Sequence, residues 1–253
     1  MPLADPALLV LLAVLVSIAA LVNGMVGFGF ALLAINALAL VLPAKDGVIV
    51  MSLLAPLMSG SQLWHHRTRI GMVRRTRGLI IGALVGSVIG TQLLVILPAP
   101  AVSVALGIFT LWFVASSLRA ERPPLTHGTQ RWLGPVAGTV GGISNGALGA
   151  SGPVFGTYLT AIGLRGAEFA VVISFAFFTM GILRVGLLVA LQQYTAVLIV
   201  IAVTLAVPSM VVQRLGFRLQ GRLPRVTIYR AVLIVLLVGG LNLLWRGLSE
   251  LLA

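Results

Sequence analysis

The sequence predicts an all-α integral membrane protein: a polytopic helical bundle built from two inverted repeats, each starting with a broken or re-entrant helix pair. Composition is the first observation behind this prediction. Of the 253 residues, 59% are apolar and only 9% are charged, and the mean hydropathy is +1.13. A soluble domain carries about 25% charged residues. The other two observations are a glycine-rich break that occurs twice and an uneven placement of arginines.

The first predicted element is an apolar helix at residues 7–22 that breaks at Asn23-Gly24-Met25-Val26-Gly27-Phe28-Gly29 and resumes at residues 30–42. Each unpaired backbone amide in hydrocarbon is costly, so such a break is tolerated only where it lines a cavity or is buried in protein. Each arm is short against a hydrocarbon core of about 30 Å. We expect a re-entrant hairpin or a broken helix pair, with a single long tilted helix as the alternative.

Three further spans complete the first half, at residues 47–64, 79–97 and 102–118. The second of these spans carries Gly82, Gly86 and Gly90, a small-xxx-small spacing that lets helices approach closely. We therefore assign residues 1–118 to a first transmembrane repeat, residues 119–132 to a cytoplasmic linker and residues 133–253 to a second transmembrane repeat.

The second half repeats this plan. The break returns 122 positions later as Asn145-Gly146-Ala147-Leu148-Gly149-Ala150-Ser151-Gly152, between short arms at residues 133–144 and 153–162. Further spans are expected at residues 169–191, 195–212 and 226–245. Paired interruptions at matching places in two halves are the best sequence pointer to the binding site of a transporter.

The arginines indicate that the repeats are inverted. Arginines fill the loop at residues 64–78, whereas the equivalent loop in the second half, at residues 190–195, has no arginine. Conversely, the loop around Pro98 is uncharged, whereas its counterpart at residues 214–225 holds four arginines. Basic residues near span ends mark the cytoplasmic side, so equivalent loops face opposite sides. This holds if each broken pair is re-entrant or makes two passes. If each were one ordinary span, the two basic loops would lie on opposite sides.

Several functions are disfavoured. The net charge is +12, but the arginines form no continuous face with interleaved aromatics, so no nucleic-acid partner is expected. The absence of cysteine excludes disulfides and thiolate metal sites. The three histidines are not clustered as ligands and no acidic pair lies inside a span, so we expect no metal, no cofactor and no catalytic residues, which disfavours an intramembrane enzyme.

The two breaks are the predicted substrate site. Glycine-rich breaks expose backbone N–H groups, and helix N-termini add partial positive charge, so both favour a small anion. The alternative is that these glycines only allow tight helix packing. The candidate residues are Asn23, Gly24, Gly27, Gly29 and Phe30 in the first break, and Ser144, Asn145, Gly146, Gly149, Ser151 and Gly152 in the second.

Arg184 and its equivalent by the same offset, Gln62, complete the candidate site. Arg184 lies in an apolar run, where a central arginine costs at least about 2.5–3.5 kcal/mol by insertion scales. It either attracts the anion or extends its charge to the membrane interface. His65 and His66 could titrate near neutral pH, but they adjoin the basic loop and are expected at its solvated edge.

The duplicated break and the spacing of the later spans resemble the sulfite exporter TauE/SafE family over nearly the whole chain. The motifs that carry the resemblance are Asn23 to Gly29, Gly82-x3-Gly86-x3-Gly90, and Gly141-Gly142-Ile143-Ser144-Asn145-Gly146 through Gly152-Pro153. The resemblance implies a multipass protein of the bacterial inner membrane that moves sulfite, a sulfonate or a related sulfur-containing anion.

We therefore expect a secondary transporter or facilitator for a small anion, with the lipid bilayer as its environment. A non-transporting membrane scaffold subunit is the alternative, although a scaffold gives no reason for two matched breaks. The direction of transport, the coupling ion and assembly into a homo-oligomer stay open.

Overall fold

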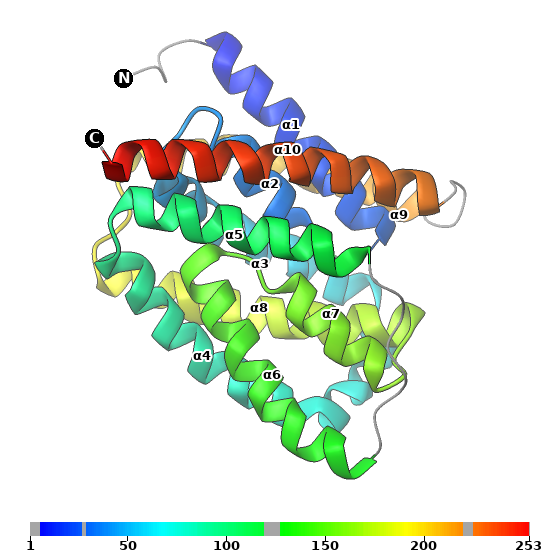
Figure 1. Cartoon of the computed structure of the whole chain (residues 1–253). Helices are drawn as coiled ribbons and strands as arrows, with labels where there is room; N and C mark the ends of the chain where they lie inside the picture. The colour runs from blue at the N-terminus through cyan, green and yellow to red at the C-terminus, as the bar shows by residue number, and fades with distance from the viewer. Residues whose placement is uncertain (1–5, 27–28, 119–126, 220–224, 253) are drawn as a thin grey trace. The chain divides into compact units, whose positions relative to one another are not determined.

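The structure is a computed structural model that describes residues 6–26, 29–118, 127–219 and 225–252. Most of these residues lie in helices, and none of them lies in a strand (Figure 1). The elements are α1 (Pro6–Val26), α2 (Phe30–Leu38), α3 (Ala44–His65), η2 (Arg67–Thr76, a 3-10 helix), α4 (Arg77–Ile96), α5 (Ala99–Ser117), α6 (His127–Leu148), α7 (Gly152–Ala161), α8 (Gly166–Ala190), α9 (Ala196–Leu219) and α10 (Arg225–Leu252).

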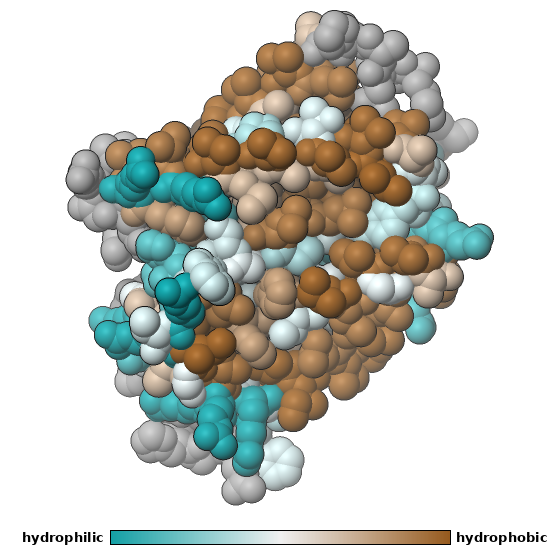
Figure 2. Space-filling model, turned by 180° about the vertical axis from the view of Figure 1, so that it is seen from behind, coloured by the Kyte–Doolittle hydropathy of each residue, from teal (hydrophilic) through white to brown (hydrophobic). Residues whose placement is uncertain are grey.

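Seven helices in the described part of the chain are long and apolar enough to cross a membrane: Ala7–Met25, Ala44–His65, Arg67–Ile96, Ala99–Ser117, Gly166–Ala190, Ala196–Leu219 and Arg230–Leu252. Large apolar side chains such as Val203, Ile234 and Val238 lie exposed on these spans, and apolar residues cover much of the face seen in Figure 2. Lipid rather than water suits such a surface. The prediction of an all-α, multipass membrane protein is confirmed.

Both helix breaks are shorter than expected. The helix before the first break continues through Asn23 and Gly24 to Val26, and the helix before the second continues through Asn145 and Gly146 to Leu148. Weak helix propensity predicted an earlier end, but it amounts to only about 1 kcal/mol per glycine. An unpaired amide at membrane depth costs more, so the helix continues until the chain must turn. Residues 27 and 28 lie outside the described part.

The chain divides into two compact units. One comprises Met1–Leu54, Pro98–Ala115 and Tyr194–Ala253, and the other comprises Ala55–Leu97 and Ser116–Gln193. We call them unit 1 and unit 2. Each unit takes helices from both halves of the sequence, so the predicted division into sequential repeats does not coincide with the compact units and stays a prediction about internal symmetry.

In unit 2, α4 and α6 run parallel and their glycines bring the two backbones together. A Cβ on Gly82 would meet the carbonyl oxygen of Pro135, and a Cβ on Gly90 would meet that of Ile143. From the other side, a Cβ on Gly142 would lie 2.8 Å from the amide nitrogen of Ser87. Only glycine permits this approach, so the predicted small-xxx-small packing of the first-half span is confirmed.

The same glycine contact occurs in unit 1, between α1 and α9. A Cβ on Gly24 would come within 2.9 Å of the Cα of Gly216, while a Cβ on Gly146 in unit 2 would come within 2.7 Å of the carbonyl carbon of Gly90. Gly146 is the repeat equivalent of Gly24. A helix from one half of the sequence thus packs on a helix from the other half in each unit.

Two further helix pairs run antiparallel. In unit 2, a Cβ on Gly181 of α8 would lie 3.0 Å from Pro56 of α3, and a Cβ on Gly60 would lie 3.2 Å from Phe178. The residue numbers rise on one helix as they fall on the other. In unit 1, α5 and α10 do the same, since Gly107 approaches Leu244 while Gly247 approaches Val104.

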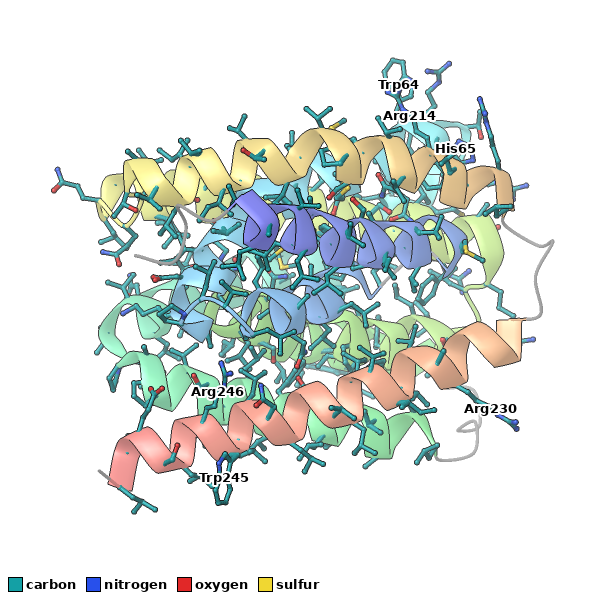
Figure 3. The ribbon with its side chains drawn as sticks, turned by 90° about the horizontal axis from the view of Figure 1, so that it is seen from above. Trp64, His65, Arg214, Arg230, Trp245 and Arg246 are labelled. Carbon is teal, nitrogen blue, oxygen red and sulfur yellow. The ribbon has the colours of Figure 1, made fainter. Side chains whose placement is uncertain are left out.

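Arg246 of α10 fixes the end of α2 in unit 1. Its Nη1 donates hydrogen bonds to the carbonyl oxygens of Ala39, at 3.1 Å, and Leu40, at 3.4 Å. These carbonyls follow the last turn of α2, where a cation is favourable. Arg246 points toward the neighbouring helices, and Trp245 points away from them (Figure 3).

Candidate functional site

The second break forms the tip of a helix hairpin within unit 2. Gly149 turns the chain with φ +72°, a left-handed conformation that favours glycine. A Cβ on Gly141 of α6 would meet the ring of Phe155 on α7, and a Cβ on Gly134 would lie 2.9 Å from the Tyr158 hydroxyl. Positions on α6 and α7 therefore pair in opposite order, so α7 returns along α6.

Both outer ends of this hairpin lie near η2. In the first half of α6, Pro135 lies 3.2 Å from where a Cβ on Gly78 would be, and Gly78 comes two residues after η2 ends. After α7, the first turn of α8 carries Glu168, whose carboxylate pairs with Arg69 of η2 at 3.5 Å. The chain thus enters α6 and leaves α7 at the same end of unit 2.

The tip of the hairpin lies past the midpoint of α4. Gly146 approaches Gly90, which precedes Ile96, the last residue of α4, by roughly 9 Å at 1.5 Å per residue. Ala150 and Ser151 at the tip are buried. The break is therefore enclosed by protein, as a break at membrane depth must be.

Ser151 is the most informative residue of the second break. It is 0% exposed, and its Oγ makes no hydrogen bond to any described residue. It occupies the N-cap position of α7 without making the usual side-chain cap bond. The first N–H groups of a helix have no intrahelical acceptor. At the start of α7 these include the N–H groups of Gly152 and Val154, since Pro153 has no N–H. The arrangement offers several hydrogen-bond donors in one buried place.

The first break, in unit 1, has a related geometry. Gly29 is the N-cap of α2 with φ +98°, and it has no side chain with which to cap the helix. Phe30 begins α2 and is buried. Asn23 is buried on α1, two residues before Met25. Gly27 lies outside the described residues.

Several candidates have a structural role. Gly24 and Gly146 bring two helix backbones together, so the packing alternative accounts for both. Ser144 donates its hydroxyl to the carbonyl oxygen of Val140 on its own helix, at 2.9 Å. Asn145 is half-buried on α6.

Arg184 and Gln62 are both buried in unit 2, each only 3% exposed. An arginine that extended its charge to an interface would be exposed, so burial argues against that alternative for Arg184. The antiparallel contact between α3 and α8 centres on Pro56 and Gly181. Gln62 and Arg184 lie on opposite sides of this contact, roughly 13 Å apart along the helix axes. The structure therefore does not bring these two equivalents together.

Arg184 instead lies at the level of Ser151. The rings of Phe155 on α7 and Phe177 on α8 pack with centroids 5.9 Å apart. Ser151 precedes Phe155 by roughly 6 Å and Arg184 follows Phe177 by roughly 10 Å, measured along two helices that run in opposite directions. Both residues lie on the side of this ring contact away from η2. A buried cation and a buried donor group thus occupy similar depths in unit 2.

His65 ends α3 and is exposed, and His66, half-buried, connects it to η2. Burial, and then the neighbouring charge of His65, lower the pKa of His66 below its usual 6.5. The two rings pack edge to face with centroids 4.8 Å apart. His66 is therefore held in its neutral form at pH 7.

Sequence reasoning missed a set of buried polar side chains within the spans. Their hydroxyls make no hydrogen bond to a described residue, and the set comprises Ser87 on α4, Ser174 on α8 and Ser209 on α9. Gln213 on α9 is buried as well, and its backbone carbonyl oxygen lies at the glycine contact with α1. Each stands out as a polar residue in an apolar run. Serine in a helix often bonds its own backbone, as Ser144 does, so that signal was weak.

Seven apolar spans and duplicated helix breaks, the second enclosed by protein, define this molecule as a multipass membrane protein. The sequence pattern of the sulfite exporter TauE/SafE family matches residues 11–243, so the chain belongs to that family. The predicted family membership is confirmed. This is a family of membrane transporters of sulfur anions, so the protein is a transporter and not an enzyme. Comparisons with curated proteins and with solved structures give no match.

Proposed function

We propose that the protein moves a small sulfur-containing oxyanion, sulfite or a sulfonate, across the bacterial inner membrane. One observation carries this proposal: at the uncapped start of α7, the buried hydroxyl of Ser151 has no hydrogen-bond partner in the described part of the chain. A buried hydroxyl without a partner costs about 1–3 kcal/mol. An anion that accepts hydrogen bonds from this hydroxyl and from the adjacent N–H groups would offset that cost.

The chemistry of the tip favours an anion over a cation. A helix N-terminus carries partial positive charge and presents N–H donors. Arg184 adds a full positive charge at a similar depth in unit 2. Compact oxyanions such as sulfite accept several hydrogen bonds at once, which matches a cluster of donors with no carboxylate among the predicted site residues.

Inverted repeats with re-entrant helix pairs are part of the same proposal. Helices α3 and α8 are equivalent by the 122-residue offset, and they pack side by side in opposite directions. A two-fold axis perpendicular to both helices relates such a pair. If these helices cross a membrane, the axis lies in the membrane plane, which is the arrangement of inverted-repeat transporters. The return of α7 toward η2 supports the re-entrant interpretation.

Flux in proteoliposomes tests the function. The purified protein should move sulfite or a sulfonate down an imposed gradient and should discriminate against cations and neutral solutes. Sulfate, thiosulfate and carboxylates complete the panel and measure selectivity. Absence of protein-dependent flux for every anion of the panel, in a preparation that is folded by circular dichroism, would leave the scaffold alternative.

A further inference from the structure

A strongly basic segment joins two of the spans in unit 2. The helix η2 connects α3 to α4, and exposed arginines lie within it and beside it: Arg67, Arg69, Arg74, Arg75, Arg77 and Arg165. Among the described residues, these arginines form a single ion pair, between Arg69 and Glu168 at 3.5 Å. Most of this positive charge therefore has no carboxylate partner in the described part of the chain.

Two tryptophans mark the same end of unit 2. Trp64 is 71% exposed at the end of α3, and Trp132 is 82% exposed near the start of α6. A Cβ on Gly78 would lie 3.2 Å from Pro135, which follows Trp132 by one turn of α6, so Trp132 lies near the start of α4. Tryptophan is highly buried on average in soluble proteins, but it is enriched where a membrane meets water. The headgroup layer is therefore expected at the level of η2.

Arg67 and Trp64 make a direct contact. The guanidinium carbon of Arg67 lies 4.4 Å from the centre of the Trp64 ring. This cation–π contact holds the Arg67 charge over the face of the ring. Trp64 points away from the helices (Figure 3). The pair thus presents a positive charge and an apolar ring on one exposed surface.

We propose that the η2 surface, the exposed side chains of Trp64, Arg67, Arg74 and Arg75 along this segment, binds the phosphate headgroups of anionic phospholipids in the surrounding bilayer. Guanidinium groups bind phosphate through two parallel hydrogen bonds, and basic segments beside spans attract anionic lipids. The exposed Trp64 and Ile70 give the acyl chains an apolar surface, which a free phosphate ion would not need.

Fluorescence quenching tests this proposal. The variant Trp112→Phe/Trp132→Phe/Trp245→Phe leaves Trp64 as the only tryptophan, since the chain has four. In detergent–lipid micelles, brominated phosphatidylglycerol should quench Trp64 at lower mole fraction than brominated phosphatidylcholine. Adding Arg74→Gln/Arg75→Gln should reduce this preference by about fivefold for each charge removed, as about 1 kcal/mol per basic residue predicts.

Matched variants separate a site from general charge attraction. Arg214→Gln/Arg218→Gln removes two arginines of α9 in the other unit and should leave the preference unchanged. Arg74→Lys/Arg75→Lys keeps the charge but removes the paired guanidinium donors, so it should retain only part of the preference. Size-exclusion profiles and thermal midpoints check that each variant is folded.

Three outcomes would overturn the proposal. Equal quenching by the two lipids removes the preference itself. An equal loss in the α9 control shows attraction to net charge instead of a site. Protection of Trp64 by millimolar inorganic phosphate shows a site for a soluble anion in place of a lipid. Each readout is a lipid contact measured without transport, so a failure here is distinct from a failure of the proposed transport function.

Discussion

A substitution that removes a single atom, the Oγ of Ser151, distinguishes a role in anion binding from a role in protein stability. Its Oγ has no hydrogen-bond partner among the described residues, so Ser151→Ala removes a desolvated group and breaks no internal bond. We expect the thermal midpoint to stay the same or rise. We expect anion flux at subsaturating concentration to fall by about fivefold to tenfold, the equivalent of one hydrogen bond of about 1–1.5 kcal/mol.

The control for this prediction is Ser144→Ala. Ser144 bonds its own helix at the carbonyl of Val140, so its loss should change flux little. Wild-type flux in Ser151→Ala, with Ser144→Ala also normal, would move the binding site away from the start of α7.

Arg184 tests whether a buried charge serves the substrate. With 3% exposure in an apolar helix, its charge must be offset by its surroundings. Arg184→Gln should raise the concentration for half-maximal flux by about tenfold or more, because a hydrogen bond to a charged group contributes about 1.5–3 kcal/mol. Arg184→Lys should retain part of the affinity. Initial rates across an anion series provide the measurement, and an unchanged half-maximal concentration in Arg184→Gln would assign the residue to folding alone.

Among the elements, the parallel pair α4–α6 depends on its glycines. A Cβ on Gly86 would meet the carbonyl oxygen of Thr139 and come within 2.9 Å of the amide nitrogen of Ile143. Gly86→Ala must separate the two backbones and should destabilise the protein by about 1–3 kcal/mol, as overpacking does. The loss is measurable as a lower thermal midpoint in detergent.

Gly186 is the matched control for this substitution. It lies within α8, and a Cβ there would have nothing within 4 Å. Gly186→Ala should therefore stabilise its helix by about 0.5–1 kcal/mol. A loss of stability in Gly186→Ala equal to that in Gly86→Ala would mean that the backbone contact is not the cause.

The ends of the helices show what sequence could predict and what it could not. Apolar length located the spans well, because a helix in hydrocarbon must be long and uninterrupted. The ends of α1 and α6 were predicted too early, because Asn23 and Asn145 were read by their propensity. Tertiary packing decides there: Gly24 and Gly146 face a neighbouring helix backbone, and such a contact stabilises a helix that propensity alone would end.

At the scale of the whole molecule, tertiary packing also limited what the sequence could predict about the candidate site. The sequence located the breaks, because matched glycine-rich segments inside two apolar runs are typical of interrupted helices in transporters. The sequence could not tell which residues of the breaks donate hydrogen bonds to a substrate and which only allow close helix packing. That distinction depends on the neighbour of each residue: Gly146 meets another backbone, whereas the hydroxyl of Ser151 meets no partner among the described residues. Ser87 and Ser209 were missed for the same reason.

The orientation of the loops can be tested on the whole molecule, because the chain contains no cysteine. Thr68→Cys lies in η2, Gln192→Cys in the connection from α8 to α9, and Arg218→Cys near the end of α9. If the basic segments are cytoplasmic, a membrane-impermeant maleimide added outside intact cells should label Gln192→Cys alone. Labelling of either Thr68→Cys or Arg218→Cys, but not both, would support the alternative in which each broken pair is one ordinary span.

The crossed glycine contacts also bear on how the protein is made. Helix α1 packs on α9, near the far end of the chain, and α4 packs on α6, which begins only at His127. The ribosome releases α1 long before its partner exists, and synthesis is slow compared with the collapse of a chain. During synthesis, α1 must therefore stay in the lipid or beside the insertion machinery until α9 has been made. A product truncated at the linker would contain α1 and α4 without the helices on which they pack.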